Sequence, residues 1–172
     1  RELDYYRQGR FMELDLASRR NLELTETLRG KEKKGSLLWV LDKTKTPMGA
    51  RMLRGWLERP LLSVTDIDRR SGAVAALVND TIRREELIAG MTGLGDMERL
   101  IGRIVYGTAG GRDMVSLRAA IEKLPNLKEQ LSAFSDRRLT ELTEAMDTLD
   151  DIGGDIAATV CDEPPFSVRE GG

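Results

Sequence analysis

Apolar residues recur every three or four positions along most of the chain, which is the spacing of helices that bury one face. The clearest case follows Asp96, a residue type that can cap the first turn of a helix. The stripe behind it is Met97, Leu100, Ile101, Ile104 and Val105. Only residues 11–16 alternate apolar and acidic side chains, so we expect a short strand there and helices elsewhere.

Thr46-Pro47 predicts the start of another well-defined helix. Thr46 can cap it, and Pro47 suits the first helical position, where a backbone donor is not needed. The apolar stripe then runs from Met48 to Leu57, and Pro60 is expected to end the helix.

Other helices follow from similar signals. Thr65, with Asp68 three residues later, predicts the start of a helix that ends at Asn79-Asp80. Thr81 predicts the start of the next helix, and Asp113 leads a later one.

The last third of the chain completes the helical pattern. Pro125 is expected to close the helix led by Asp113, and Leu127 and Leu131 predict a further short helix. The last clear stripe covers residues 139–149, and residues 152–160 extend it. At least seven helices with short polar joints indicate an all-α fold, an irregular multi-helix bundle.

Large aromatic side chains and several polar ones are expected to pack helices together. Trp39 and Trp56 lie in apolar helical runs, and we expect both in the core, the usual place of such a side chain. Salt bridges and hydrogen bonds that lock helices together are expected from Asp15, Arg19, Arg20, Asn21, Arg51 and Arg54.

Composition and charge indicate a globular chain that makes few direct contacts with DNA. The 172 residues include 40% hydrophobic and 33% charged side chains, a globular balance, and no apolar run approaches the about 20 residues of a membrane span. Residues 1–60 carry 14 basic and 9 acidic side chains, whereas residues 136–172 carry three and ten. DNA-binding modules usually have a more concentrated basic face, so few direct DNA contacts are expected.

The chain has no histidine and a single cysteine, Cys161. The missing histidine excludes a Ser-His or Cys-His nucleophile pair, an imidazole base and a His-Cys zinc site. Acidic neighbours of Cys161 disfavour a reactive thiolate. We therefore predict no catalytic, no cofactor-binding and no metal-ligating residue in this chain.

Two polar motifs are better explained as solvated surface than as sites. Residues 30–36 contain two glycines before a helix, but the lysine that a phosphate loop needs after the second glycine is missing. We expect a basic turn, with a weak phosphate-backbone contact through Lys31, Lys33 or Lys34 as the alternative. We also expect a solvated acidic face rather than a cation site at the end of the chain, because the glycine turn of a calcium loop is missing there. This face comprises Asp147, Asp150, Asp151 and Asp155.

Several sequence blocks are more specific than the periodicity around them. They are Leu14-Asp15 with SRRNLEL at 18–24, GSLLWVLD at 35–42, TKTPMGARML at 44–53, GDMERLIGR at 95–103, and the closing Pro164-Pro165 with REGG at 169–172. Together they resemble the core, or lever, domain of the MutS family of DNA mismatch repair proteins. The resemblance is strong over residues 12–132, thinner over residues 133–163, and returns at the end.

The resemblance implies a domain organisation. Residues 1–172 correspond to one sequence half of the core domain, residues 1–12 to the segment that arrives from the connector domain, and residues 164–172 to the lead into the DNA clamp. The family's clamp and the Gly-Lys-Ser/Thr loop of its ATPase are expected elsewhere in a longer parent. Phe11-Met12-Glu13 has the letters of the family's Phe-x-Glu mismatch wedge but lies in the arriving segment, so we reject it as the wedge.

The resemblance also implies a function. The chain is expected to be a helical lever that couples the ATPase of a mismatch repair protein to its clamp and its mismatch-reading domain, without being an enzyme itself. For the parent it implies ATP and Mg as cofactors, mismatched duplex DNA, a homodimer, a MutL-type repair partner, no membrane, and a cytoplasmic, nucleoid-associated location in bacteria. The alternative is a helical interaction module of a MutS relative that acts outside post-replicative mismatch repair.

Overall fold

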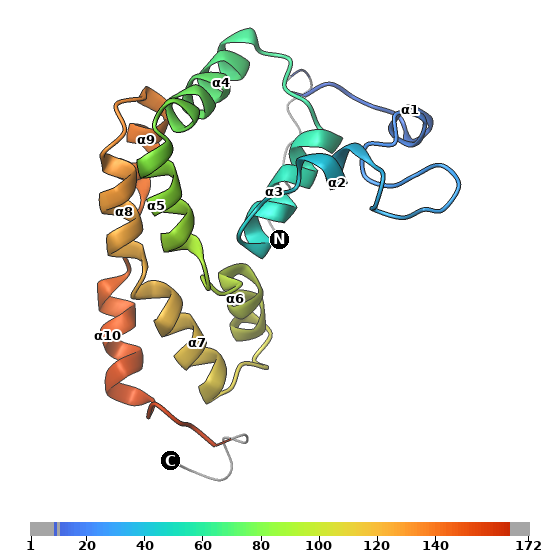
Figure 1. Cartoon of the computed structure of the whole chain (residues 1–172). Helices are drawn as coiled ribbons and strands as arrows, with labels where there is room; N and C mark the ends of the chain where they lie inside the picture. The colour runs from blue at the N-terminus through green and yellow to red at the C-terminus, as the bar shows by residue number, and fades with distance from the viewer. Residues whose placement is uncertain (1–8, 10, 166–172) are drawn as a thin grey trace. The chain divides into compact units, whose positions relative to one another are not determined.

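The computed structural model describes residue 9 and residues 11–165, and regular structure in this part of the chain is helical (Figure 1). This confirms the predicted all-α fold. The described helices are α1 (Leu16–Asn21), α2 (Leu37–Leu41), α3 (Pro47–Glu58), α4 (Val64–Asn79), α5 (Thr81–Met91), α6 (Met97–Val105), α7 (Gly111–Ile121), α8 (Leu124–Ser132), α9 (Arg137–Ala145) and α10 (Asp150–Thr159).

The prediction of a strand over residues 11–16 is wrong. In the described residues, extended pairing is limited to one isolated antiparallel bridge between Phe11 and Leu61. Helix α1 already begins at Leu16, because the Asp15 carboxylate accepts a 2.6 Å hydrogen bond from the backbone N–H of Ser18. The alternation of side chains was too short to outweigh this cap.

The chain divides into two compact units. Unit 1 comprises Arg1–Thr44 and Gly49–Gly72, and unit 2 comprises Lys45–Met48 and Ala73–Gly172. Each is described below by itself.

Unit 1 has a small core around the start of α2. Leu24 and Leu38 are buried there, and Ser36 is fully buried. The Ser36 hydroxyl donates to the Lys33 carbonyl at 2.6 Å and accepts from the backbone N–H of Trp39 at 3.2 Å, so it caps α2. One polar side chain therefore fixes both the preceding turn and the helix start.

Unit 2 contains two separate apolar clusters. In it, α5 packs on α8, α8 on α9, α6 on α7, and α7 on α10. The first cluster is Ala73, Leu131, Phe134 and Leu139, with Ala76, Leu77, Leu87 and Met146 packed against it. The second is Leu117, Ile121 and Ile156, with Met97, Leu100, Met114, Leu149 and Val160 packed against it.

Predicted helix boundaries hold where proline or aspartate sets them. Helix α3 begins at Pro47 and ends before Pro60, as expected. Helix α6 is capped by Asp96, whose carboxylate accepts from the backbone N–H of Arg99 at 3.2 Å. Helix α5 begins at Thr81 as predicted, with Asp80 as its cap.

Three boundaries differ from the prediction. Helix α4 begins at Val64, since the Ser63 hydroxyl rather than Thr65 accepts from the first turn, at Asp66 N. Helix α7 begins at Gly111, so Asp113 sits inside its first turn. It ends at Ile121, and Pro125 opens α8 instead of closing α7, because proline is tolerated in a first turn.

The stripe from residue 139 onwards forms two helices rather than one. Leu149 has a left-handed backbone (φ 56°) between α9 and α10, which ends any continuous helix. The Asp147 carboxylate accepts from the backbone N–H of Leu149 at 2.9 Å, and that of Asp150 accepts from the Thr148 hydroxyl at 2.7 Å. Asp151 and Asp155 are exposed on α10, and Cys161 is exposed beyond it, as expected for a solvated acidic face.

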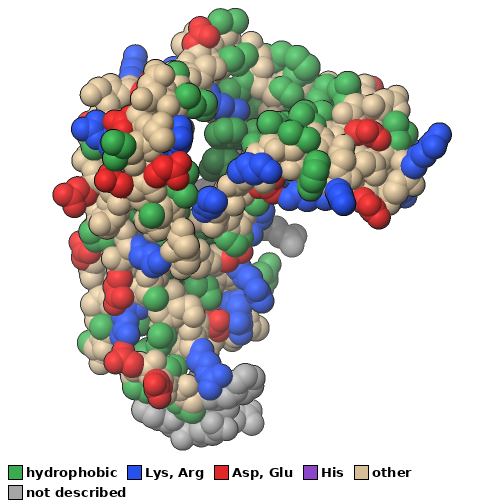
Figure 2. Space-filling model, in the orientation of Figure 1, with side chains coloured by type: hydrophobic (Ala, Val, Ile, Leu, Met, Phe, Trp, Pro, Cys, Tyr) green, Lys and Arg blue, Asp and Glu red, His purple; other side chains and the backbone are tan. Residues whose placement is uncertain are grey.

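The expectation that both tryptophans lie in the core is wrong. Trp39 is 47% exposed and Trp56 is 40% exposed. The Arg70 guanidinium lies 3.6 Å from the centre of the Trp56 ring, so a cation–π contact covers one face of it. Apolar side chains are visible over much of the surface in Figure 2, since these short helices leave many large side chains partly uncovered.

Candidate functional site

Polar contacts join separate helices at several points in unit 2. Three of the residues predicted to lock helices make local contacts instead. Arg19 Nε donates to the Leu14 carbonyl at 2.9 Å, Arg54 pairs with Glu58 within α3, and Asp15 caps α1. Different cations connect one helix to the next, and most of them bind backbone carbonyls. These helix joints are the candidate functional site.

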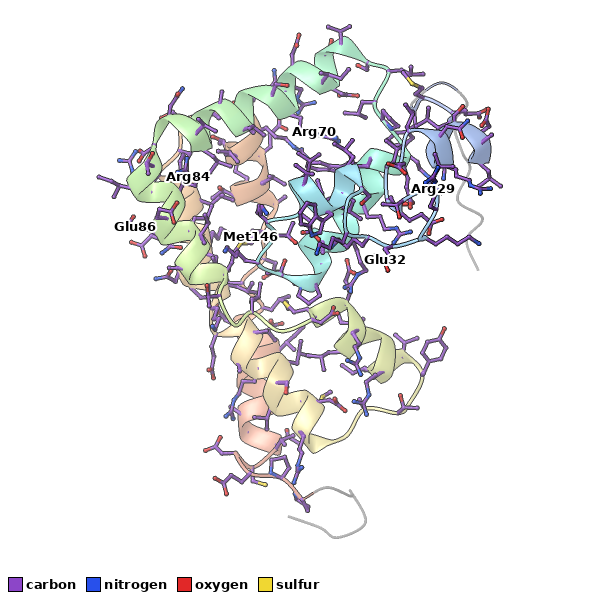
Figure 3. All side chains as sticks on the ribbon, turned by 45° about the vertical axis from the view of Figure 1, so that its right-hand side comes forward. Arg29, Glu32, Arg70, Arg84, Glu86 and Met146 are labelled. Atoms are coloured by element: carbon purple, nitrogen blue, oxygen red, sulfur yellow. The ribbon has the colours of Figure 1, made fainter. Side chains whose placement is uncertain are left out.

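Two arginines near the start of α5 bind the ends of neighbouring helices, Arg84 at the end of α4 and Arg83 at the end of α8. Arg84 Nη1 lies 3.4 Å from the carbonyl oxygens of Leu77 and Val78, in the last turn of α4, where carbonyls have no partner within the helix. Arg83 Nη1 donates to Asp80 at 3.1 Å and to the Ala133 carbonyl at 3.2 Å. Figure 3 labels Arg84 on α5, near the end of α4.

Two lysines close the joints on either side of α8. Lys123 Nζ donates to the carbonyl of Thr92, the residue after α5, at 2.8 Å. Lys128 Nζ donates to the carbonyl of Met146, the residue after α9, at 2.6 Å in a partly buried position. Both carbonyls lie at helix carboxyl ends, where the helix dipole favours a positive charge. Each lysine therefore ties α8 or its cap to the end of a neighbouring helix.

A three-way contact fixes the turn between α6 and α7. Arg103 donates to the Asp113 carboxylate at 2.7 Å and to the Thr108 carbonyl at 3.1 Å. The other oxygen of Asp113 accepts from the backbone N–H of Gly110 at 2.9 Å, which completes the helix cap. Gly107 adopts φ 67°, the left-handed backbone that glycine tolerates best.

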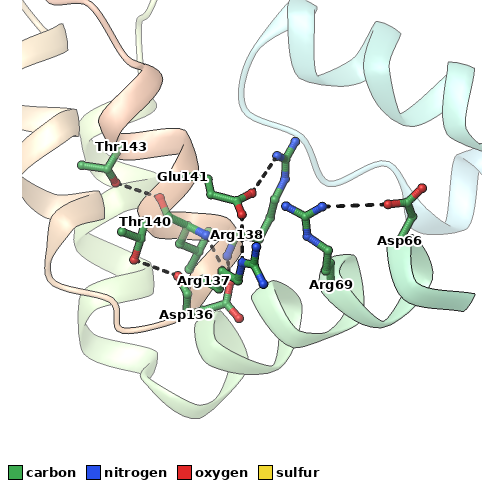
Figure 4. Close-up of polar contacts among 9 residues, drawn as sticks. Asp66, Arg69, Asp136, Arg137, Arg138, Thr140, Glu141 and Thr143 are labelled. Carbon is green, nitrogen blue, oxygen red and sulfur yellow. Dashed lines mark hydrogen bonds and ion pairs between the residues drawn. The ribbon is translucent and has the colours of Figure 1, made fainter.

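The start of α9 is held by its own aspartate (Figure 4). The Asp136 carboxylate accepts from the backbone N–H groups of Arg138 and Leu139, at 2.8 and 3.1 Å. Arg137 pairs with Glu141 one turn later at 3.1 Å, on an exposed face. The Arg137 pair does not join two helices, which makes it a useful comparison for the joints.

The segment after α10 is anchored to α7. Arg118 pairs with the Asp162 carboxylate, a contact that raises the pKa of the guanidinium. Arg112 Nε lies 3.4 Å from the Pro164 carbonyl. Gly111 lies so close to the Pro164 ring that a β-carbon there would be only 2.7 Å from Pro164 Cβ.

In unit 1 the turn predicted over residues 30–36 is confirmed as part of the connection between α1 and α2. Lys33 Nζ donates to Asp42 Oδ2, and the Thr44 hydroxyl donates to Asp42 Oδ1 at 2.6 Å. These hydrogen bonds, the one from Lys33 above all, lower the pKa of Asp42 to about 2. The turn is thus tied to the end of α2.

Acid is expected to weaken unit 1 through Asp42. Its native pKa of about 2 is below the ordinary 3.8, so the ionised carboxylate favours the folded state above pH 3.8 and this contribution is lost as pH falls through about 2. Because Lys33 is half exposed, the pair is worth only about 1 kcal/mol or less. Thermal melting of Lys33→Gln from pH 7 to pH 2 should show a small loss of stability at neutral pH that shrinks as the pH approaches 2. Lys34→Gln, next to it and without an ion pair, should melt like the parent at every pH.

Sequence reasoning missed the residues that form the joints. Arg83 and Arg84 could have been identified, because two positive charges in the first turn of a helix are unfavourable to its dipole. Their presence there indicates that they bind acceptors outside the helix. Lys123 and Lys128 carried none, since their acceptors are backbone oxygens far away in sequence. Among the residues that the structure describes, no group of acidic or cysteine side chains is arranged to hold a metal ion, and none of the helices is long and apolar enough to cross a bilayer.

Comparison with known proteins identifies the family. A family model described as MutS domain III matches residues 17–172. DNA mismatch repair protein MutS of Alkaliphilus oremlandii is 49% identical over 161 residues, which cover 94% of this chain and 18% of that protein. The proteins of the same name from Brevibacillus brevis and Symbiobacterium thermophilum are 48% and 45% identical, over 100% and 99% of this chain and 20% and 19% of their own lengths.

The chain thus spans about a fifth of the length of these relatives. The family model nevertheless covers almost the whole chain, including every helix joint described above. An all-α fold and near-complete coverage by this model agree with the resemblance seen in the sequence blocks. The chain belongs to the MutS family, whose domain III it matches.

Proposed function

We propose that this chain is the helical lever of a bacterial DNA mismatch repair protein. In this role it carries movement between the parent's ATPase and its DNA clamp and mismatch-reading domain, and it performs no chemical step itself. We further propose that residues 1–12 arrive from the connector domain and that residues 164–172 lead into the clamp. The names of the relatives favour mismatch repair over a role outside it.

The locked helix joints of unit 2 carry this proposal. A lever transmits displacement only if its helices do not pivot at the turns between them. Charged hydrogen bonds from Lys123 and Lys128 to helix-end carbonyls oppose such pivoting, and Arg103 with Asp113 does the same between α6 and α7. Hydrogen bonds of this charged kind contribute about 1.5–3 kcal/mol where water is excluded, and less at an exposed site such as that of Lys123. Stiffness therefore comes from contacts placed at the points where the chain turns.

The remaining functions belong to the parent protein. We propose that it binds ATP and Mg in a separate ATPase domain, recognises mismatched duplex DNA as a homodimer, and works with a MutL-type repair partner. It would act in the bacterial cytoplasm, at the nucleoid when DNA is bound. The lever supplies no cofactor ligand in this scheme.

Loosening two joints in the longer parent protein tests the lever. Lys123→Met with Lys128→Met keeps the side-chain length but removes both donors. The basal ATPase rate and the affinity for mismatched DNA should stay within about twofold, while ATP-driven release of that DNA slows by about tenfold, the factor that corresponds to ~1.4 kcal/mol. ATPase assays, fluorescence anisotropy and stopped-flow release measure the three quantities.

Arg137→Gln is the matched control, because Arg137 is a cation whose pair stays within one exposed helix turn. It should leave all three quantities unchanged. If the double variant released DNA at the parent rate while its lysine contacts were gone, the lever proposal would be wrong.

A further inference from the structure

Cations without a partner gather in one short part of unit 1. Arg29, Lys31, Lys34 and Lys43 are all exposed, and within the described residues none of these side chains makes a hydrogen bond or ion pair. Most cations of unit 2 bind carboxylates or backbone carbonyls, as at the helix joints. Figure 3 shows Arg29 on the connection between α1 and α2, and Figure 2 shows Lys and Arg side chains projecting from its outer end. We call residues 29–34 with Lys43 the basic turn.

The basic turn is ordered by its own backbone. Thr27 N donates to the Glu32 carbonyl at 2.9 Å, and Lys31 N donates to the Thr27 carbonyl at 3.1 Å. Lys31 holds a left-handed backbone at φ 49°. The buried Ser36 then fixes the end of the turn through the Lys33 carbonyl. Because the backbone is fixed, binding an anion does not have to order the turn first, and only the side chains must adjust.

Nearby carboxylates neutralise only part of this charge. Asp42 is occupied by Lys33, and the Glu23 carboxylate accepts from the backbone N–H of Leu28 at 2.7 Å. Glu26 and Glu32 remain as exposed acids near the basic turn. Because a backbone N–H does not neutralise a carboxylate, Glu23 keeps its charge. Four unpaired cations against Glu23, Glu26 and Glu32 still leave the turn positive, by one charge.

The side-chain types decide what kind of anion fits. The residues of the basic turn include no aromatic side chain on which a base could stack, and the exposed Trp39 lies outside the turn, on α2. Lysines are flexible point charges that suit phosphate oxygens and carry no sequence information. Such a surface fits the outside of a nucleic-acid duplex, where one negative charge occurs per about 1.7 Å of helix axis.

We propose that the basic turn contacts the phosphate backbone of duplex DNA and adds affinity that does not depend on the sequence or on the mismatch. This inference rests on the proposed function, because it is the DNA bound by the parent that the turn would touch. It assigns to unit 1 a direct role in binding, separate from the transmission of movement by unit 2.

The salt dependence of DNA binding tests this contact in the longer parent protein. Lys31→Gln with Lys34→Gln should lower the slope of log affinity against log salt concentration by about 1.8, since each phosphate contact contributes about 0.9. Near 0.15 M salt the affinity should fall by about fivefold per lysine on the same relation. The loss should be equal for matched and mismatched duplexes of the same length, measured by anisotropy, and the melting temperature should not change.

Arg99→Gln with Arg137→Gln removes the same charge from exposed positions in unit 2 and is the control. It should leave the slope unchanged. An unaltered slope in the lysine variant, or an equal fall in the control, would overturn the contact and point to an acidic protein partner or to a general charge effect. A parent protein that did not prefer mismatched DNA at all would instead contradict the proposed function, so the two failures are distinguishable.

Discussion

Replacing Ile121 with alanine is expected to lower the free energy of unfolding of unit 2 by about 2–5 kcal/mol. Ile121 is 3% exposed and belongs to the cluster that joins α7 to α10. Alanine would leave a cavity that the two helices, held at their ends by polar contacts, can fill only in part. Such a loss is a large fraction of the stability of an ordinary domain.

Ile101→Ala is the matched control for this change. Ile101 lies on α6 and is 50% exposed, so the same truncation removes less buried surface and should cost below about 1 kcal/mol. Urea unfolding followed by circular dichroism measures both. Equal losses in the two variants would mean that the second cluster is not the core of this part of unit 2.

Two neighbouring glycines on α10 should respond in opposite directions to the same substitution. A β-carbon at Gly153 would lie 3.1 Å from Ile121 Cγ2, whereas one at Gly154 has nothing within 4 Å. Gly153→Leu should therefore push α10 from α7 and destabilise unit 2 by about 1–3 kcal/mol. Gly154→Leu should stabilise it by up to ~1 kcal/mol, because leucine favours the helix more than glycine does.

Thermal melting of the two leucine variants measures both changes in stability. The two variants carry the same substitution in the same helix, so they differ only in position. The difference in sign is the result that matters, since a general effect of leucine on α10 would shift both variants together. A stabilised Gly153→Leu variant would contradict the close approach of α10 to α7.

Much of the fold was predictable because local signals set it. Pro47 and Asp96 mark helix starts through backbone geometry and capping, which depend on only a few neighbouring residues. The break at Leu149 was missed because leucine carries no sign of a left-handed backbone, and the apolar spacing continues across it. The spacing of apolar residues and the capping residues therefore predicted most helices. They did not predict the helix break at a residue that departs from its usual backbone conformation.

The joints were beyond prediction for a different physical reason. A lysine that binds a backbone carbonyl leaves no complementary residue in the sequence to search for, unlike a lysine paired with an aspartate. Trp39 and Trp56 show the converse error, because an apolar stripe indicates which face of a helix avoids water but not whether another element covers it. Short helices in a small unit left that face partly open.

The carbonyl acceptors at the helix joints have a consequence for how this domain can vary among organisms. Every amino acid brings the same main-chain oxygen, so Thr92 and Met146 can be exchanged for other residues without losing the acceptor. At these two joints, selection for stiffness then falls on the lysine alone. Each of these two contacts depends on the identity of one residue, the lysine. The residue that supplies the carbonyl can therefore be substituted while the contact is kept.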